Sequence, residues 1–168
     1  MVPVLVITGP VGVGKSTVLH EIDQHLVAAG VPHASVELEE LARCWTPGSA
    51  NRTALVYGNL AALWASYAAH GAGRLAITML LEDRADLARL SEAVPDARLT
   101  VVRLTAPLAV LEQRLYQREP DPAAELGAAR YLVRRMAEQD VADHLVDNGR
   151  RPVSEVALDV LRLAGWLA

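Results

Sequence analysis

A glycine-rich segment between an apolar run and an amphipathic stretch constrains the fold of this 168-residue chain more than any other feature. It reads Gly-Pro-Val-Gly-Val-Gly-Lys-Ser-Thr over positions 9–17 and matches G-x-x-x-x-G-K-[ST] at every specified position. The preceding run, 2–8, is apolar and β-branched, which is typical of a strand buried on both faces of a parallel sheet. Apolar residues then recur at helical spacing over 16–29, before Gly30 and Pro32. The sequence therefore predicts a strand, a tight glycine turn and a helix.

A turn of this kind, a P-loop, is suited to binding phosphate groups. Its glycines let backbone N–H groups surround a phosphate, and the following helix adds its N-terminal dipole. We expect Lys15 to bridge the β- and γ-phosphates of a nucleotide and the Ser16 hydroxyl to ligate Mg²⁺. The full set of expected nucleotide-binding residues in the segment is Gly9, Gly12, Val13, Gly14, Lys15, Ser16 and Thr17. A glycine turn without a ligand is the alternative, but the motif's place between strand and helix argues against it.

The use of lysine supports a functional P-loop. Of the 16 basic residues, 15 are Arg and the single Lys is Lys15. A codon bias against Lys would account for the excess of Arg but not for this exception. A compact ammonium group reaches phosphate oxygens inside a tight loop better than a planar guanidinium does.

Composition argues against several other classes of protein. A net charge of -4 with mixed signs provides no basic surface for nucleic acid. Cys44 is the only cysteine, so an intramolecular disulfide and a multi-cysteine metal site are both excluded. No apolar run reaches the ~18 residues of a membrane span, and the first residues lack the basic start of a signal peptide. We therefore expect one cytoplasmic domain over 1–168, a monomer or homodimer that binds neither nucleic acid nor membranes.

Strands and helices are predicted to alternate along the rest of the chain. Apolar runs predict four more strands, at 33–38, 74–81, 99–104 and 144–147. Such alternation implies right-handed crossovers and a parallel sheet with helices on both faces. The expected fold class is α/β, a three-layer α/β/α P-loop NTPase fold with a five-stranded parallel sheet in the order 2-3-1-4-5 and a small helical lid. A closing helix is expected over 153–167, with Ser154 as its N-cap.

This layout resembles that of the small P-loop kinases, such as shikimate kinase, gluconate kinase, adenylylsulfate kinase and chloramphenicol phosphotransferase. A Ras-like GTPase normally carries an N-K-x-D guanine signature, which a chain with one Lys cannot make, and ABC-type or motor ATPases are far longer. The resemblance covers almost the whole chain, although the motifs outside the P-loop match more loosely. It implies ATP and Mg²⁺ as cofactors and a small molecule as the phosphoryl acceptor.

Two glutamates follow the second predicted strand. In the kinases that this chain resembles, a carboxylate pair at this place faces the transferred phosphoryl group. The resemblance assigns Glu37 to Mg²⁺ and Glu39 to the acceptor hydroxyl as catalytic base. If the segment is extended, the one-residue gap puts both side chains on one face. The alternative is a solvated, acidic helix start in which Glu39 and Glu40 interact with the helix dipole.

The same kinases have a lid, a helix-loop-helix whose arginines neutralise charge that develops on the phosphates. The resemblance places this lid at about 114–135, with a flap at 119–125, and gives the catalytic role to Arg114 and Arg118, four residues apart before the flap. The next helix returns three more arginines: Arg130, Arg134 and Arg135. The alternative for each is an ordinary surface residue of an Arg-rich chain.

Two regions fit the kinase pattern less closely. Many P-loop enzymes end the third strand with an Asp that holds the metal's water shell, but 75–81 is uncharged until Glu82 and Asp83. Either these residues bend back toward the metal or Glu37 takes this role. The loop 147–150 resembles the segment that passes beside adenine, a backbone contact that we assign to Gly149.

The acceptor is expected between the end of the second strand and the helices of 41–67. The charged, amide and aromatic groups there that suit a small polar molecule are Arg43, Trp45, Arg52, Tyr57, Asn59 and Trp64. We take Arg43, Arg52 and Asn59 as the candidates for binding it, and a plain surface role is equally open for the two arginines. Two functions follow from these patterns. One is an ATP-dependent kinase acting on a small-molecule hydroxyl, and the other is a nucleotide-binding protein without transfer activity that acts by sequestration or as a switch.

Overall fold

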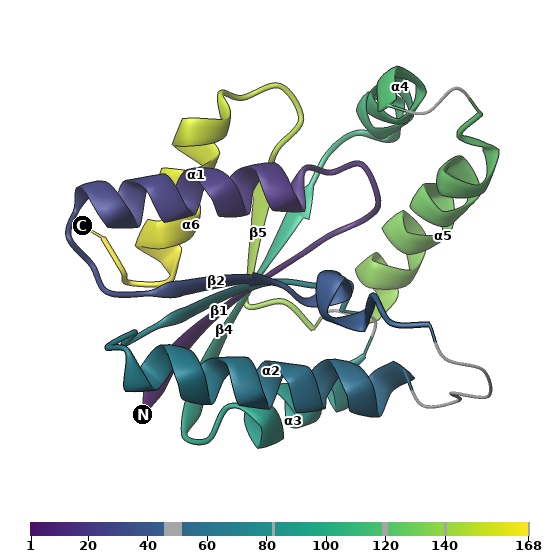
Figure 1. Ribbon diagram of the computed structural model, residues 1–168. Coiled ribbons are helices and arrows are strands. Elements are labelled where there is room, and N and C mark those ends of the chain that lie inside the picture. The colour runs from purple at the N-terminus through teal and green to yellow at the C-terminus, as the bar shows by residue number, and fades with distance from the viewer. Residues whose placement is uncertain (46–51, 82, 119–120, 140, 168) are drawn as a thin grey trace.

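The computed structural model describes residues 1–45, 52–81, 83–118, 121–139 and 141–167. Its five parallel strands form one sheet in the order β2-β3-β1-β4-β5 (Figure 1). The strands are β1 (Val2–Thr8), β2 (Ala34–Glu37), β3 (Leu75–Thr78), β4 (Ala97–Thr105) and β5 (His144–Asp147). The α/β class and the strand order predicted from the sequence are confirmed.

The helices form layers on both faces of this sheet. Their bounds are α1 (Lys15–Ala28), a 3₁₀ helix η1 (Leu38–Ala42), α2 (Arg52–Ala69), α3 (Arg84–Ala93), α4 (Leu108–Arg118), α5 (Ala123–Gln139) and α6 (Val153–Leu163). Helices α1 and α6 cover one face, and α2 and α3 cover the other (Figure 1). In the described part of the chain, no helix combines the length and the apolarity that a membrane span requires.

Strand β1 contributes side chains to both hydrophobic cores. Leu5 and Ile7 are buried in the cluster that includes α1 and α6, whereas Val4 and Val6 are buried in the cluster that includes α2 and α3. Successive side chains of a strand point to opposite faces, so a strand covered on both faces is apolar at every position. This burial explains the continuous apolar run that precedes the P-loop and fixes the P-loop at the carboxyl edge of the central strand.

Helices α4 and α5 lie beside the carboxyl ends of the strands, apart from the two helical layers (Figure 1). A third, small cluster of Leu115, Leu126 and Ala129 lies between them and extends to Val11 of the P-loop. Arg130 of α5 also pairs with Glu112 of α4, with 2.6 Å between Nη2 and Oε1. The predicted lid is therefore the end of α4 together with most of α5. Two residues of the predicted flap, 119–120, lie outside the described residues.

The prediction of an extended segment from Glu37 to Glu39 is wrong. Strand β2 ends at Glu37, which pairs with Thr78 at the end of β3. Past this pair β3 offers no further ladder partners, and the chain turns into the 3₁₀ helix η1, whose first turn contains Glu39. The two glutamates are therefore placed by a strand end and a helical turn, and not by alternation along one strand.

The N-cap expected at Ser154 is also wrong. Pro152 occupies the N-cap position of α6, and Ser154 lies inside the helix. Its hydroxyl contacts His25 Nε2 of α1 at 2.9 Å, so it joins the two helices on this face of the sheet. Pro152 fits before the first helical turn because its missing N–H has no intrahelical partner there.

Candidate functional site

The P-loop backbone can adopt its conformation only with glycines at three positions. Gly9, Gly12 and Gly14 have φ values of 147°, 82° and 98°, which L-residues rarely adopt. A Cβ on Gly9 would lie 2.6 Å from the Leu104 carbonyl oxygen, and one on Gly14 would lie 2.8 Å from Nδ2 of Asn148. The loop is thus a tight backbone cradle, as phosphate binding requires.

A cavity of about 530 Å³ opens over this cradle, and we call it the P-loop cavity. Seven of the residues predicted to bind nucleotide or to act in catalysis line it: Gly12, Gly14, Lys15, Ser16, Thr17, Arg114 and Arg118. Gln117 and Arg151 also line it and were not predicted from the sequence, as does Asn148 of the loop predicted to pass beside adenine. The other three residues predicted to bind nucleotide are buried and do not line the cavity: Gly9, Val13 and Gly149.

Lys15 is held inside the cradle. Its ammonium donates a hydrogen bond to the Gly9 carbonyl oxygen at 3.1 Å. Burial lowers the pKa of Lys15 below the ordinary lysine value, while the nearby Glu39 and Glu37 carboxylates oppose this effect. A partly desolvated cation at this position would gain strongly from anionic phosphate oxygens.

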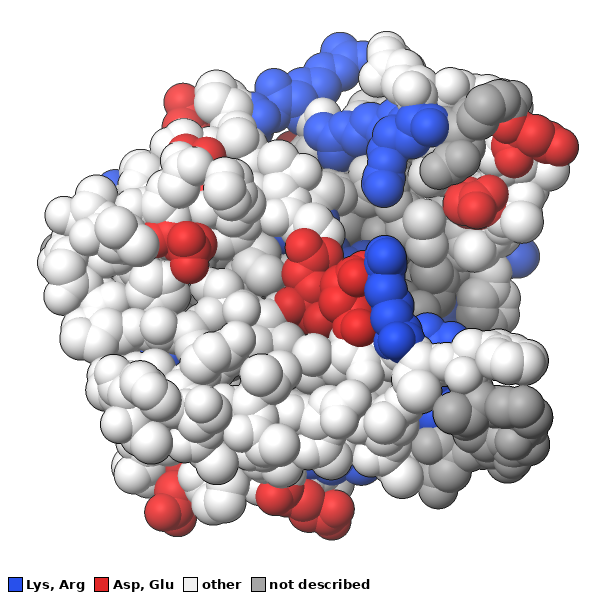
Figure 2. All heavy atoms as spheres, viewed as in Figure 1, with Lys and Arg blue, Asp and Glu red and all other residues white. Residues whose placement is uncertain are grey.

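Glu37 and Glu39 both lie near the Lys15 ammonium, and each is held there by a different hydrogen bond. The Ser16 hydroxyl donates a hydrogen bond of 2.5 Å to Oε2 of Glu37, and Oε1 of Glu39 accepts one of 2.7 Å from the Leu80 backbone N–H. Both carboxylates influence the Lys15 ammonium. Figure 2 shows acidic side chains gathered at the centre of this face, over the region of η1, with basic side chains across a hollow above them.

The donor set around Ser16 fits Mg²⁺. A hydroxyl and a carboxylate are hard oxygen donors, and Mg²⁺ typically takes one or two protein ligands together with water and substrate phosphates. Among the described residues there is no group of three or more His, Cys, Asp or Glu side chains that would form a metal site without a nucleotide. Ser16 and Glu37 therefore suit a cation that arrives with phosphate, and not a metal held by the protein alone.

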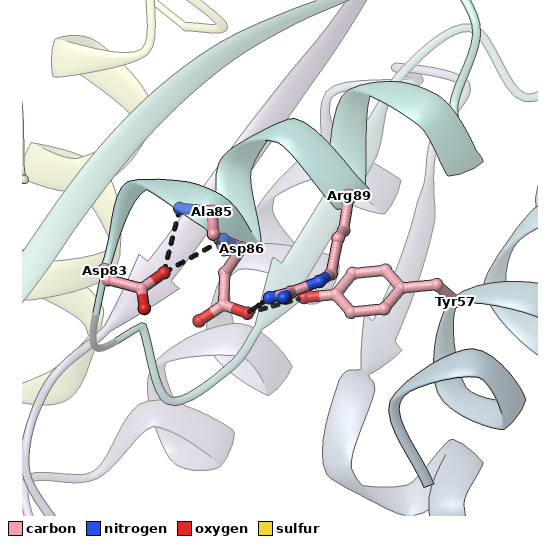
Figure 3. A network of polar contacts seen from close by, with 5 residues as sticks. All are labelled: Tyr57, Asp83, Ala85, Asp86 and Arg89. Carbon is pink, nitrogen blue, oxygen red and sulfur yellow. Dashed lines mark hydrogen bonds and ion pairs between the residues drawn. The ribbon is translucent and has the colours of Figure 1, made fainter. Parts of the chain in front are cut away.

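No described carboxylate takes the third-strand position that is acidic in many P-loop enzymes. Strand β3 ends at Thr78, whose buried hydroxyl has no hydrogen-bond partner among the described residues. Asp83 accepts hydrogen bonds from the backbone N–H groups of Ala85, at 2.8 Å, and Asp86, at 3.3 Å (Figure 3). It is the N-cap of α3. Glu82 lies outside the described residues.

Arg114 makes backbone contacts that sequence reasoning did not anticipate. Its guanidinium donates to the carbonyl oxygens of Val13 at 3.2 Å, Asn148 at 2.8 Å and Gly149 at 3.0 Å. The amide of the buried Asn148 side chain donates to the same Val13 carbonyl at 2.7 Å. Arg114 and Asn148 together connect the P-loop to the loop after β5. Arg118, one turn further along α4, is exposed and makes no hydrogen bond in the described part of the chain, but its charge lowers the pKa of Lys15.

A second cavity, of about 410 Å³, lies on the far side of Glu39 and is called the side cavity below. Its walls come from η1, α2, the residues after β3, and the start of α3. Of the residues predicted to bind the acceptor, Arg52 lines this cavity. Arg43 instead pairs with Glu40, 2.6 Å from Nε to Oε2, and Asn59 donates to the Leu41 carbonyl at 2.9 Å. Neither of these two residues lines the side cavity.

One end of the side cavity carries a polar network of which Tyr57, but neither Asp86 nor Arg89, was named from the sequence. The Tyr57 hydroxyl donates to Oδ1 of Asp86 at 3.3 Å, and Nη1 of Arg89 donates to the same oxygen at 2.8 Å (Figure 3). Burial, followed by the Asp86 carboxylate, raises the pKa of the Tyr57 phenol far above its ordinary value. In the sequence, Asp86 has only the signature of an acidic residue in a first helical turn, so no motif indicated its role.

Comparison with known proteins shows the fold. No family model and no curated protein matches the chain. Among solved structures, the tunicamycin resistance protein of Deinococcus radiodurans is 24% identical, with 99% of this chain and 98% of that chain covered and a TM-score of 0.72. A gluconokinase from Sinorhizobium meliloti is 22% identical over 96% and 90% of the two chains, with a TM-score of 0.62. The APS kinase of Mycobacterium tuberculosis, in complex with AMPPNP and APS, is 19% identical over 98% of each chain, with a TM-score of 0.63. The chain therefore has the fold of the small P-loop kinases, as its resemblance to them predicted.

Proposed function

We propose that this chain is an ATP-dependent kinase that transfers the γ-phosphoryl group to a hydroxyl of a small molecule. The observation that carries the proposal is the position of Glu39. This side chain lines the side cavity, and its carboxylate is close enough to the Lys15 ammonium to oppose the lowering of the lysine pKa by burial. A hydroxyl held in the side cavity would therefore lie beside the phosphate end of the P-loop cavity.

The residues of the two cavities take complementary roles in this proposal. The P-loop N–H groups and Lys15 bind the phosphates of the nucleotide, and Glu39 accepts the proton of the acceptor hydroxyl as its oxygen bonds to phosphorus and the bond to ADP breaks. Arg118 supplies positive charge above the transferred group. Ser16 and Glu37 would hold Mg²⁺, which neutralises charge on the phosphates when bound. The AMPPNP complex of the APS kinase neighbour supports an adenine nucleotide.

Arg114 has a positioning role in this account. Within the described part of the chain its guanidinium donates to backbone carbonyls of the P-loop and of the loop after β5, so its charge is already hydrogen-bonded. It acts on the nucleotide through the shape of the loop.

A nucleotide-binding protein without transfer activity is the second candidate. The observation that favours it is the end of β3, where Thr78 stands and where Asp83 is engaged as a helix cap. Such a protein would keep the P-loop contacts and lack a productive acceptor site.

Turnover separates the two candidates. The purified protein is incubated with Mg-ATP and a panel of hydroxyl-bearing metabolites and antibiotics while ADP is followed. Acceptor-dependent ADP release that Lys15→Ala abolishes is expected for the kinase, and the variant excludes a contaminating enzyme. Tight ATP binding without turnover for any acceptor would instead support the silent nucleotide-binding protein.

A further inference from the structure

Half of the described residues that line the side cavity are apolar, and the others are Glu39, Arg52, Thr53, Tyr57 and Asp86. Five apolar residues line it: Leu38, Ala42, Val56, Met79 and Leu80. Arg52 is the only cationic residue among the described lining residues, and it is exposed at the first turn of α2. An anionic group of a ligand buried among these walls would lose its hydration without gaining a buried cationic partner, which is costly.

The polar end of the cavity presents hydrogen-bond acceptors. The Tyr57 hydroxyl donates a hydrogen bond to Asp86, and the raised pKa of the phenol keeps the proton on the tyrosine oxygen. Oδ1 of Asp86 already accepts from Tyr57 and Arg89, whereas Oδ2 has no hydrogen-bond partner among the described residues (Figure 3). Arg89 does not line this cavity, and it lines the groove between α2 and α3 instead. This end is thus ready to accept a proton donor from a ligand.

The same requirement holds at Glu39, which also lines the cavity and needs a hydroxyl of the ligand as its proton donor if it is to act as a base. A ligand that satisfies the whole cavity has an alcohol at one end, an apolar body, and an N–H or O–H donor at the other end. A volume of about 410 Å³ lies within the range of roughly 300–1,000 Å³ that is usual for small-molecule sites.

We propose that the phosphoryl acceptor is a non-anionic alcohol with an apolar body and a distal amine or hydroxyl that binds Asp86. This inference rests on the proposed function, because it takes the side cavity as the acceptor site. In the transfer step the alcohol oxygen forms its bond to the γ-phosphorus, the bond between that phosphorus and ADP breaks, and the alcohol proton passes to Glu39. The distal donor group takes no part in this step and sets specificity only.

Three probes with the same ring and the same hydroxyl test the class of acceptor. They are trans-4-aminocyclohexanol, trans-1,4-cyclohexanediol and trans-4-hydroxycyclohexanecarboxylate, which carry a cationic, a neutral and an anionic distal group. Binding of each probe is measured by ligand-observed NMR, with the protein saturated by Mg²⁺ and a non-hydrolysable ATP analogue. We expect the amine and the diol to bind at least tenfold more tightly than the carboxylate. Equal or tighter binding of the carboxylate, or no binding of any of the three, would overturn the inference.

Two substitutions at the polar end should change this preference in opposite directions. Asp86→Asn removes the negative charge and should reduce the preference for the amine over the carboxylate at least tenfold. Arg89→Gln removes the cation that pairs with Asp86 and changes no residue of the cavity lining itself, and should increase that preference. Because Asp86→Asn also loosens the Tyr57 network, its fold is checked by thermal unfolding, and Arg89→Gln alone decides the matter if the first variant is unstable.

Glu92→Gln is the matched control. Glu92 lies on the same helix as Asp86 and loses the same charge, but it lines the outer groove between α2 and α3 and not the side cavity. Its probe preference should equal that of the parent. If Asp86→Asn and Arg89→Gln both leave the preference as Glu92→Gln does, Asp86 does not select the ligand.

Binding and transfer are scored separately, so that the two proposals fail in different ways. Selective binding of the amine and the diol without any ATP-dependent transfer would count against the kinase and support the chemistry of the cavity. Efficient transfer to an anionic hydroxy acid would support the kinase and overturn the inference about its acceptor.

Discussion

Among the described residues, a carbonyl and two nearby carboxylates are what the Lys15 ammonium has to compensate for its burial. A phosphate oxygen would provide a stronger partner than the carbonyl, in a charge-assisted contact worth about 1.5–3 kcal/mol. Lys15→Ala should therefore lower ATP affinity or turnover at least tenfold, as measured by calorimetry and ADP release, while thermal unfolding confirms that the fold survives. A variant that binds and turns over ATP like the parent would show that the P-loop assignment is wrong.

The substitutions Glu37→Gln and Glu39→Gln should change the kinetics in different ways. Glu37 accepts a hydrogen bond from the proposed magnesium ligand Ser16, so Glu37→Gln should lower the rate and weaken its dependence on Mg²⁺, because a neutral amide attracts a hard cation less. Glu39→Gln should leave ATP binding near normal and reduce transfer by ~10²–10⁴, as is typical when a proton acceptor is lost. Initial rates over a magnesium titration measure both effects. Identical profiles for the two variants would contradict the division of roles.

The sequence singled out these two carboxylates as candidates, and the structure corrects the geometry that was expected for them. Alternation along a strand was the expected cause of their proximity, whereas a strand end and a 3₁₀ turn place them. The pairing of Glu37 with Thr78, which ends the β2–β3 ladder, depends on where a different strand stops. That information is not local to the segment, so pattern reading found the residues without their geometry.

Two arginines one turn apart on α4 are expected to have different functions. Arg114 donates to three backbone carbonyls, so Arg114→Ala should lower the free energy of unfolding by about 1.5–3 kcal/mol and weaken ATP binding by loosening the P-loop. Arg118→Ala is the matched control on the same helix. It should leave the free energy of unfolding unchanged, because the side chain is exposed and makes no hydrogen bond to a described residue, and it should lower turnover. Urea unfolding and ADP release distinguish the two variants, and equal loss of stability in both would contradict the positioning role of Arg114.

Elements with a strong pattern were predicted well, and contacts between elements were not. The apolar run of β1, the P-loop and the helical spacing of α1 depend on local chemistry and on burial against both layers, both of which the sequence carries. The helical pattern of α4 makes Arg114 and Arg118 equivalent, because each lies three residues beyond a buried leucine, Leu111 or Leu115. What separates them is the position of the Val13 carbonyl, more than 100 residues away in the chain, and no periodicity records that position.

Over the whole molecule, the hydrophobic interior is divided in a way that suits motion at one end. Two large clusters join the sheet to its helical layers, and the third, around Leu115 and Leu126, belongs mainly to α4 and α5. Val11 of the P-loop packs against that small cluster. Leu111 near the start of α4 is buried in the first large cluster and Val133 of α5 packs against it, so we expect motion at the facing ends of the two helices, around Leu115 and Leu126, and not along their whole length.

Closure of these helices over bound nucleotide is the remaining prediction. Arg118 at the end of α4 lines the P-loop cavity, so anionic phosphates should draw this end of the helix toward the cradle. We expect a non-hydrolysable ATP analogue with Mg²⁺ to slow amide hydrogen exchange between about Tyr116 and Arg130, as measured by mass spectrometry. Peptides from α3, outside the P-loop cavity, provide the control and should exchange at the same rate in both states. Arg118→Ala should bind the analogue and lose much of this protection, because the charge that attracts the helix is gone. Equal exchange between Tyr116 and Arg130 with and without the analogue would show that α4 and α5 do not act as a lid, and Arg118 would then have to reach the phosphates from the position that it already occupies.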